Sequence, residues 1–187
     1  MTILTENTPE SGGVLRGDSD RPRRDELSPV VVVLDRLRSA YNVGNVFRVA
    51  EALRVERIVT TGYTATPPHE KLAKTARDCD RLVACHHRET AGEAIAELKK
   101  SGHTVYGVET VAGAESVWTV HLKFPAAFVL GNEALGLGND ALEGCDAFIR
   151  LPMFGMKNSI NVGNAAAVIL YEAVRQIDSG PRPGKQV

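Results

Sequence analysis

The sequence predicts an α/β fold with a mainly parallel sheet and helices on both of its faces. Three observations support this fold class. Short β-branched segments alternate with segments of helical spacing, the first strand candidate is a continuous apolar run from Val30 to Leu34, and a long apolar-rich helix candidate closes the pattern. A strand that is apolar on both faces fits a sheet covered on both sides. Alternation of strands and helices favours parallel pairing, because each helix can serve as a crossover.

The elements follow one another in a regular order. We expect strands at 30–34, 57–61, 82–85, 104–108, 126–130 and 147–151, and helices at 43–53, 90–100 and 161–176. The first helix is predicted from apolar residues at helical spacing, namely Val43, Val46, Phe47, Ala50 and Leu53.

The second helix has clear terminal signals. Thr90 is the expected N-cap, and Glu93 three residues later forms a capping box with it. Gly102 follows as a stop signal.

Bulk composition indicates one globular domain. The 187 residues are 43% hydrophobic and carry a net charge of −1, so any nucleic-acid site must be a local basic patch. We expect free thiols in a reducing cytoplasm at Cys79, Cys85 and Cys145, and no metal site, because no His/Cys set has ligand spacing. With neither an apolar signal core nor a run of about 18 apolar residues, we expect a cytoplasmic location and no membrane contact.

Both ends of the sequence are polar. Residues 1–28 are rich in Gly, Pro, Ser and Asp, and residues 178–187 hold two prolines and two glycines. We expect flexible tails at 1–28 and 178–187, with the folded domain spanning 29–177.

Common nucleotide-binding signatures are absent. The segment after the first strand lacks the G-x-G-x-x-G pattern of a Rossmann fold, and neither a P-loop nor a G-x-S-x-G hydrolase turn occurs anywhere. Instead, Gly- and Asn-rich segments at 42–45, 131–138 and 152–155 each follow a strand candidate. Loops at the carboxyl ends of parallel strands bind ligands, so these loops could jointly hold one ligand or could be simple turns.

The three loops resemble the signature motifs of the SpoU (TrmH) family of SPOUT-class RNA 2′-O-ribose methyltransferases. The first matches Asn42-x-Gly44-x-x-x-Arg48, and the second matches Gly131-x-Glu133-x-x-Gly136. The third matches Leu151-Pro152-Met153-x-Gly155-x-x-x-Ser159-Ile160-Asn161-Val162. The motifs occur in the family's order, and the resemblance covers roughly residues 30–177.

The resemblance implies features that the pattern alone does not show. One is a deep C-terminal trefoil knot, a rare arrangement among folds. Another is a homodimer with active sites near the subunit interface, to which the closing helix at 161–176 would contribute. Its small residues, such as Ala165, Ala166 and Ala167, would let another backbone approach closely.

The resemblance also implies S-adenosyl-L-methionine as the cofactor, held largely by backbone groups. The matching positions are Leu130, Gly131, Leu151, Met153, Ile160 and Asn161. Among these, Leu151, Met153 and Ile160 can supply an apolar slot for adenine.

The implied reaction transfers a methyl group to a ribose 2′-hydroxyl. The family assigns removal of the hydroxyl proton to the arginine that matches Arg48. Because a guanidinium is a reluctant base, Arg48 could instead bind the adjacent phosphate and stabilise the forming alkoxide. Asn42 and Asn161 could position the ribose or orient Arg48.

Glu133 and Ser159 complete the catalytic candidates. Glu133 could pair with Arg48 or Asn42, or could fix its loop through backbone amides. Ser159 could contact phosphate or Arg48. A structural role in the loops is the alternative for both.

Two basic clusters could follow an RNA backbone or could be solvated surface. One contains Arg16, Arg21, Arg23, Arg24, Arg36 and Arg38, and the other contains His69, Lys71, Lys74, Arg77, Arg81, His86, His87 and Arg88. We expect tRNA as the substrate, with 23S rRNA as the alternative. The sequence also leaves open an inactive knotted RNA-binding protein and a non-RNA α/β nucleotide-binding enzyme.

Overall fold

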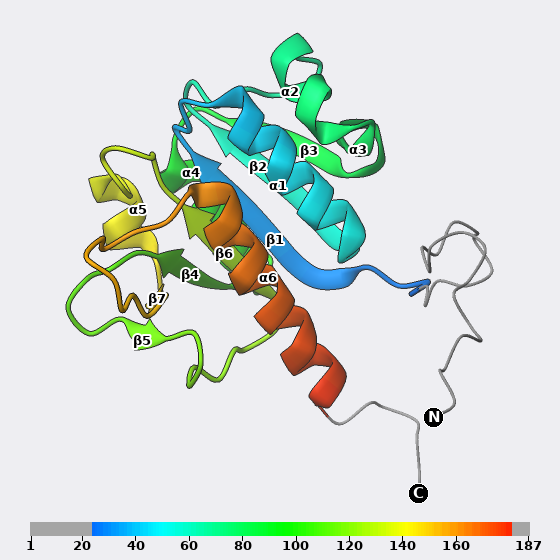
Figure 1. Ribbon diagram of the computed structural model, residues 1–187. Helices are drawn as coiled ribbons and strands as arrows, with labels where there is room; N and C mark the ends of the chain where they lie inside the picture. Colours follow the sequence, from blue (N-terminus) through cyan, green and yellow to red (C-terminus); the bar gives the residue numbers. More distant parts are fainter. Residues whose placement is uncertain (1–23, 181–187) are drawn as a thin grey trace, which may run out of the picture.

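A seven-stranded sheet lies at the centre of the computed structural model, which describes residues 24–180 (Figure 1). In chain order the strands are β1 (Ser28–Asp35), β2 (Val55–Thr61), β3 (Ala84–Arg88), β4 (Thr104–Val108), β5 (Glu115–Ser116), β6 (Ala126–Leu130) and β7 (Ala147–Arg150). Their spatial order is β3-β2-β1-β6-β4-β7-β5, and every pairing of these strands is parallel. The predicted mainly parallel sheet is therefore confirmed.

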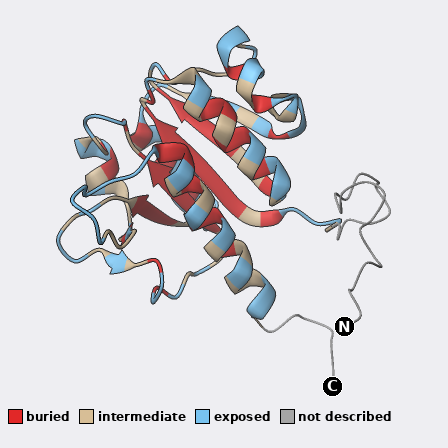
Figure 2. Cartoon of the chain, in the orientation of Figure 1, coloured by how far each residue is buried: buried red, intermediate tan, exposed pale blue. Residues whose placement is uncertain are grey.

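Strand β1 is buried on both faces, as its apolar run predicts. Val30, Val32 and Leu34 belong to one core cluster, whereas Val31 and Val33 belong to a second cluster on the opposite face. Successive side chains of a strand point to opposite faces, so five consecutive apolar residues serve both layers. Figure 2 shows this buried strand at the centre of the fold.

Helices cover both faces of the sheet. α1 (Ala40–Ala52) and α6 (Val162–Ser179) pack in the first core cluster through residues such as Phe47 and Ile169. α4 (Ala91–Lys100) and α5 (Asn139–Gly144) pack in the second through Ile95 and Ala141. Two short helices, α2 (Glu70–Ala76) and α3 (Cys79–Leu82), lie beside α1 (Figure 1).

The region between β2 and α4 differs from the sequence expectation. The strand expected at 82–85 is displaced, because Leu82 ends α3 and the strand occupies Ala84–Arg88. β3 is an edge strand with no buried residue, so it lacks the apolar pattern by which the inner strands are predicted. Helix α2 was not predicted, because it is short and buries only Leu72 and Ala76.

One of the two hydrogen bonds of the predicted capping box of α4 is displaced by one residue. Thr90 is the N-cap and its hydroxyl accepts the Glu93 N–H at 3.1 Å. The Glu93 carboxylate accepts the N–H of Glu89 at 3.2 Å, one residue before the position that the capping box assigns. The helix therefore begins where it was predicted, with an altered hydrogen bond.

The ends of the described chain meet. Arg24 forms an ion pair with Asp178 near the end of α6, which continues to Ser179. The expected tails otherwise fall at 1–23 and 181–187, outside the described residues. Within 24–180, none of the helices combines the length and apolar character that crossing a membrane requires.

Candidate active site

The three motif loops leave the sheet at one edge. In register, Leu34 of β1 lies beside Leu130 of β6, Leu130 lies beside Val108 of β4, and Val108 lies beside Ile149 of β7. The parallel strands therefore end together, and the segments leading to α1, α5 and α6 gather at that end (Figure 1). This edge is where open α/β sheets bind ligands.

One hydrogen-bond network joins the three motifs. Asn42 donates from Nδ2 to Oε1 of Glu133 at 2.8 Å, and Asn161 donates from Nδ2 to Oδ1 of Asn42 at 3.0 Å. Asn42 therefore lies between Glu133 and Asn161, which are far apart from it in sequence. We call these three residues the Asn42 network.

Glu133 also caps the entrance to α1. Its carboxylate accepts the backbone N–H of Arg38 at 2.9 Å and that of Ser39 at 3.2 Å. Partial burial by itself would raise the pKa of Glu133, but the hydrogen bonds from Arg38, Asn42 and Ser39 more than offset it, so the pKa lies below its ordinary value. Glu133 is thus an ionised acceptor, and it contacts Asn42 rather than Arg48.

Asn161 has a second role as the N-cap of α6. Its Oδ1 accepts the N–H of Gly163 at 2.9 Å and that of Asn164 at 3.4 Å. A Cβ at Gly163 would lie 2.6 Å from Nδ2 of Asn45, so α1 and α6 approach closely at this point. The Asn161 amide therefore connects the start of α6 to the Asn42 network.

Asn132 organises the Gly131–Gly138 loop and was missed by the sequence analysis. Its Oδ1 accepts the N–H groups of Ala134 and Leu135 at 2.9 and 3.0 Å. Its Nδ2 donates to the carbonyl of Arg36 at 2.7 Å and to the hydroxyl of Tyr63 at 2.8 Å. Asn is a common turn former, and Asn132 stands two residues after the end of a predicted strand, which is the signal that could have identified it.

Glu109 is a second residue that the sequence analysis missed. It follows β4, and its carboxylate accepts the N–H of Leu137 at 3.2 Å and that of Thr110 at 2.9 Å. The φ of Gly136 is +69, which favours glycine, and a Cβ there would lie 2.4 Å from Oε2 of Glu109 and displace that carboxylate. Glu109 thereby holds the Gly136–Leu137 end of the Gly131–Gly138 loop. Its position directly after a predicted strand is the sequence feature that could have identified it.

The predicted cofactor positions lie at the end of β6 and on the segments that follow β6 and β7. Leu130 is buried at the end of β6, and a Cβ at Gly131 would come within 2.4 Å of the Gly136 backbone. Leu151 and Met153 are half-buried, and Ile160 is exposed in an irregular segment. The contact at Gly131 lies within its own loop and sets the shape of that loop. The accessible side chains of Leu151, Met153 and Ile160 can supply an apolar surface for the ring of a ligand.

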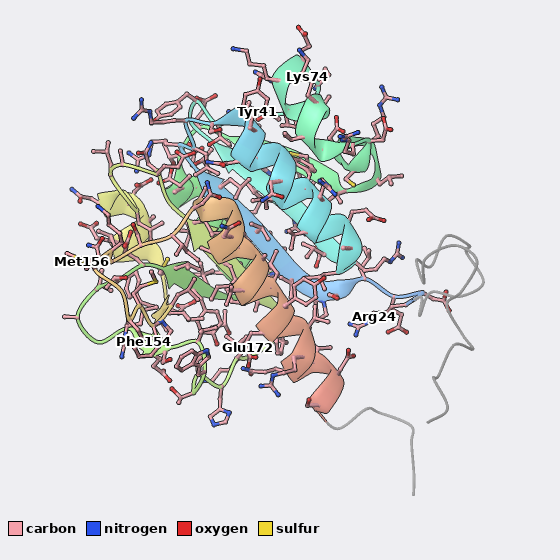
Figure 3. The ribbon with its side chains drawn as sticks, viewed as in Figure 1. Arg24, Tyr41, Lys74, Phe154, Met156 and Glu172 are labelled. Atoms are coloured by element: carbon pink, nitrogen blue, oxygen red, sulfur yellow. The ribbon has the colours of Figure 1, made fainter. Side chains whose placement is uncertain are left out.

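Large apolar side chains also project from the third loop. Phe154 and Met156 are strongly exposed and lie on the same side of the molecule (Figure 3). Phe154 stacks on Trp118 with ring centroids 5.8 Å apart. Exposed apolar side chains that gather on one side of a molecule are typical of surfaces that contact a ligand or another macromolecule.

Arg48 and Ser159 lie outside the Asn42 network. Both are exposed, and neither side chain makes a hydrogen bond or an ion pair with any residue in the part of the chain that is described. Arg48 lies near Cys79 of α3, whose thiol pKa is raised chiefly by burial and is lowered in part by the Arg48 charge. The guanidinium of Arg48 is therefore accessible from solvent.

The two predicted basic clusters are divided by the fold. Arg16, Arg21 and Arg23 lie outside the described residues, Arg24 pairs with Asp178, and Arg36 pairs with Asp35 at 2.8 Å. Figure 3 places Arg24 far from Tyr41 and Lys74. By contrast, Arg38 of the first cluster and three members of the second (His69, Lys71 and His87) line one cavity.

Comparison with known proteins identifies a family whose model matches most of the chain. Residues 29–171 match the SpoU rRNA Methylase family. The chain belongs to this family. It is 31% identical over 156 residues to a 23S rRNA (guanosine-2′-O-)-methyltransferase of Pseudomonas putida. The aligned region covers 82% of this chain and 61% of that protein.

Solved structures of the SpoU family share the fold. The SpoU methyltransferase AviRb of Streptomyces viridochromogenes, in complex with the cofactor AdoMet, superposes with a TM-score of 0.73 at 30% identity, covering 85% of this chain and 64% of that one. A TrmH/SpoU tRNA modifying enzyme of A. aeolicus has a TM-score of 0.74 at 23% identity, covering 81% and 77% of the two chains, and this likeness concerns the fold. The chain spans less than two thirds of the length of the curated relatives that it matches.

Proposed function

We propose that this chain is an S-adenosylmethionine-dependent RNA methyltransferase that methylates a ribose 2′-hydroxyl, with tRNA as its substrate. The observation that carries the proposal is the Asn42 network, in which one residue from each family motif meets at the ligand-binding edge of the sheet. Membership of the SpoU rRNA Methylase family supports it independently.

The cofactor is assigned to the loops after β6 and β7. The residues that would hold it are Leu130, Gly131, Leu151, Met153, Ile160 and Asn161. When bound, S-adenosylmethionine supplies the electrophilic methyl group. The AdoMet complex of AviRb, at 30% identity, supports this assignment.

The protein's own residues position the acceptor. The Asn42 network fixes the loops that would surround the ribose, so its 2′-hydroxyl can be held in line with the methyl group. Arg48, exposed on α1, is available to contact a phosphate or to stabilise the alkoxide that forms as the hydroxyl loses its proton. Ser159 is available for a phosphate contact from the third loop.

The test is a transfer assay with tritiated S-adenosylmethionine and bulk tRNA or 23S rRNA, followed by nuclease mapping. We expect label in a 2′-O-methylated nucleotide of tRNA, recognised because 2′-O-methylation protects the adjacent phosphodiester bond against alkali. Cofactor binding is measured in parallel by calorimetry. Transfer to neither RNA, together with no cofactor binding, would contradict the proposal. RNA binding without transfer would instead identify an inactive RNA-binding protein.

A 23S rRNA substrate is the second candidate. The Pseudomonas putida relative that is 31% identical to this chain carries that activity in its name. Label in 23S rRNA and not in tRNA would select this candidate over the first.

We also propose the homodimer and the C-terminal knot that the family resemblance implies. Val168 and Tyr171 on α6 are exposed apolar residues, which supports a partner on that helix. β4 lies between β6 and β7 in the sheet, so the chain must cross from one side of β4 to the other. Sedimentation equilibrium tests the dimer. Single-molecule extension tests the knot, because a tightened knot shortens the fully extended chain.

A further inference from the structure

A cavity of about 750 Å³ lies beside the Asn42 network and is not used by the proposed methyl transfer. It is bounded by the start of α1, the segment after β2 and the start of α2. The lining side chains on which the argument depends are Arg38, Tyr41, Tyr63, His69, Lys71 and His87. Among the described residues, no Asp or Glu lines this cavity.

The cavity collects positive charge that its surroundings do not neutralise. Arg38 and Lys71 are exposed, and neither side chain forms an ion pair within residues 24–180. Two nearby basic side chains are neutralised by ion pairs, because Lys74 pairs with Glu70 at 3.2 Å and Arg88 pairs with Glu97 at 2.6 Å. In a chain of net charge −1, two such cations at one cavity indicate an anionic ligand.

Two exposed tyrosines give the same cavity an aromatic surface. Tyr63 is 61% exposed and Tyr41 is 50% exposed. The Tyr63 hydroxyl accepts a hydrogen bond from Asn132 at 2.8 Å, so the ring is held in place while much of its surface stays in solvent. Fixed aromatic rings beside cations are the features by which proteins bind unpaired nucleotides.

A histidine adds a directional donor. Nδ1 of His69 accepts the N–H of Leu72 at 3.3 Å. In the neutral ring the proton is therefore on Nε2, which is available to a phosphate or a base.

The cavity is connected to the proposed active site through two loops. Arg38 lines the cavity with its side chain while its backbone N–H donates to Glu133. Tyr63 contacts Asn132, the residue between Gly131 and Glu133. A ligand here would therefore lie beside the loop that carries Asn132 and Glu133.

We propose that this cavity binds an unpaired nucleotide of the RNA adjacent to the methylated one. Its base stacks on Tyr63 and Tyr41, and its flanking phosphates contact Arg38 and Lys71. The proposal rests on the proposed function, and it makes the preferred substrate a single-stranded loop, since a base in a duplex cannot stack on these rings.

The charge component is tested by anisotropy of a fluorescein-labelled single-stranded RNA between about 50 and 200 mM salt. The double variant Arg38→Gln/Lys71→Gln should bind more weakly, and the slope of log affinity against log salt should fall by about 1.4, the value for two phosphates of a single strand. Lys74→Gln is the matched control on the same helix and should bind like wild type. A double variant with wild-type affinity and slope overturns the proposal.

The stacking component is tested at Tyr63. Tyr63→Leu should weaken RNA binding about fivefold or more, whereas Tyr63→Phe, which keeps the ring, should bind like wild type. Equal loss in both variants would assign the effect to the hydrogen bond with Asn132 and overturn the stacking role. Adenosine monophosphate that displaces the RNA at equal concentration would assign the cavity to a free nucleotide and overturn the RNA assignment.

Failure of this inference is separable from failure of the proposed function. Cofactor binding by calorimetry should be unchanged in Arg38→Gln/Lys71→Gln, which also shows that the variant is folded. Wild-type protein that methylates RNA alongside variants with unchanged RNA affinity would reject only the cavity assignment. Wild-type protein that neither binds nor methylates RNA would reject both.

Discussion

Arg48 differs from the residues of the Asn42 network because its side chain makes no hydrogen bond or ion pair within residues 24–180. The Asn42 network is complete without it, and its guanidinium lies exposed on α1. An exposed residue of this kind can be changed with little effect on the fold, so its contribution to the reaction can be measured cleanly.

Arg48→Ala should lower methyl transfer by about 100-fold or more while cofactor binding stays near wild type, because an electrostatic contact to the developing charge is lost. Transfer rates and calorimetry measure the two effects. Arg48→Lys is the informative control, since it keeps the charge and loses the planar donor geometry. Near-normal transfer by Arg48→Ala would exclude the proposed role.

Glu133→Gln should destabilise the protein by less than about 1 kcal/mol at neutral pH, because one amide N–H group would face the donors whose hydrogen bonds the carboxylate now accepts. The effect is small because Glu133 is exposed and water screens its charge. The folded-state pKa of Glu133 is lowered, so its stabilising effect is present above the unfolded pKa of about 4.3 and is lost as the pH falls through the lower folded value.

Thermal unfolding of wild type and Glu133→Gln as a function of pH measures this difference. The two melting curves should converge in acid. Glu143→Gln on α5 is the control, because Glu143 is exposed and makes no hydrogen bond or ion pair with the described residues. A difference in melting temperature between the two proteins that stays constant down to acid pH would contradict the proposal that Glu133 acts as an ionised acceptor.

At the scale of elements, α6 connects stability with the site. Asn161 caps the helix with Oδ1 and contacts Asn42 with Nδ2. The two functions use different atoms of one amide. A substitution that keeps one atom type and replaces the other can therefore separate them.

Asn161→Ala should lower stability by about 1 kcal/mol, which corresponds to about 2–4 °C in melting temperature for a domain of this size. Asn161→Asp keeps the capping oxygen and removes the amide donor, so it should restore stability but not methyl transfer. Calorimetric melting and the transfer assay report the two effects. Full activity of Asn161→Asp would show that the contact with Asn42 is dispensable.

The sequence predicts elements well where apolar periodicity is strong. β1, α1, α4 and α6 were located because each buries several regularly spaced residues. α2 and β3 were missed or displaced because they bury little. The three loops were found, and pairing of Glu133 with Asn42 was one of the alternatives left open. Only the fold selects it, because the two residues are 91 positions apart. Asn132 and Glu109 each follow a predicted strand, but their contacts with Tyr63 and Leu137 join separate segments and emerge only in the fold.

At the scale of the whole molecule, α6 leaves an apolar side uncovered. Tyr171 is 59% exposed and Val168 is 43% exposed, and both follow the network-bearing end of the helix. In the proposed homodimer this surface would be buried against a second copy, which would bring two active sites near each other.

Tyr171→Glu should shift the protein from dimer to monomer, because a charge would be buried in the interface. Sedimentation equilibrium measures the change. Leu82→Glu, at an exposed apolar position of α3 that is 70% accessible, should leave the assembly unchanged. A wild-type monomer, or a Tyr171→Glu dimer as tight as wild type, would contradict an interface on α6.

The position of β1 in the sheet also determines when each of its two edges can be paired during synthesis. β1 is paired on one side by β2, which follows closely, but on the other side by β6, whose residues begin at Ala126. A nascent chain leaving the ribosome therefore presents a hydrophobic strand with an open edge until most of the domain has been synthesised. Truncated products that stop before Ala126 would keep that edge open, making them candidates for chaperone capture and aggregation.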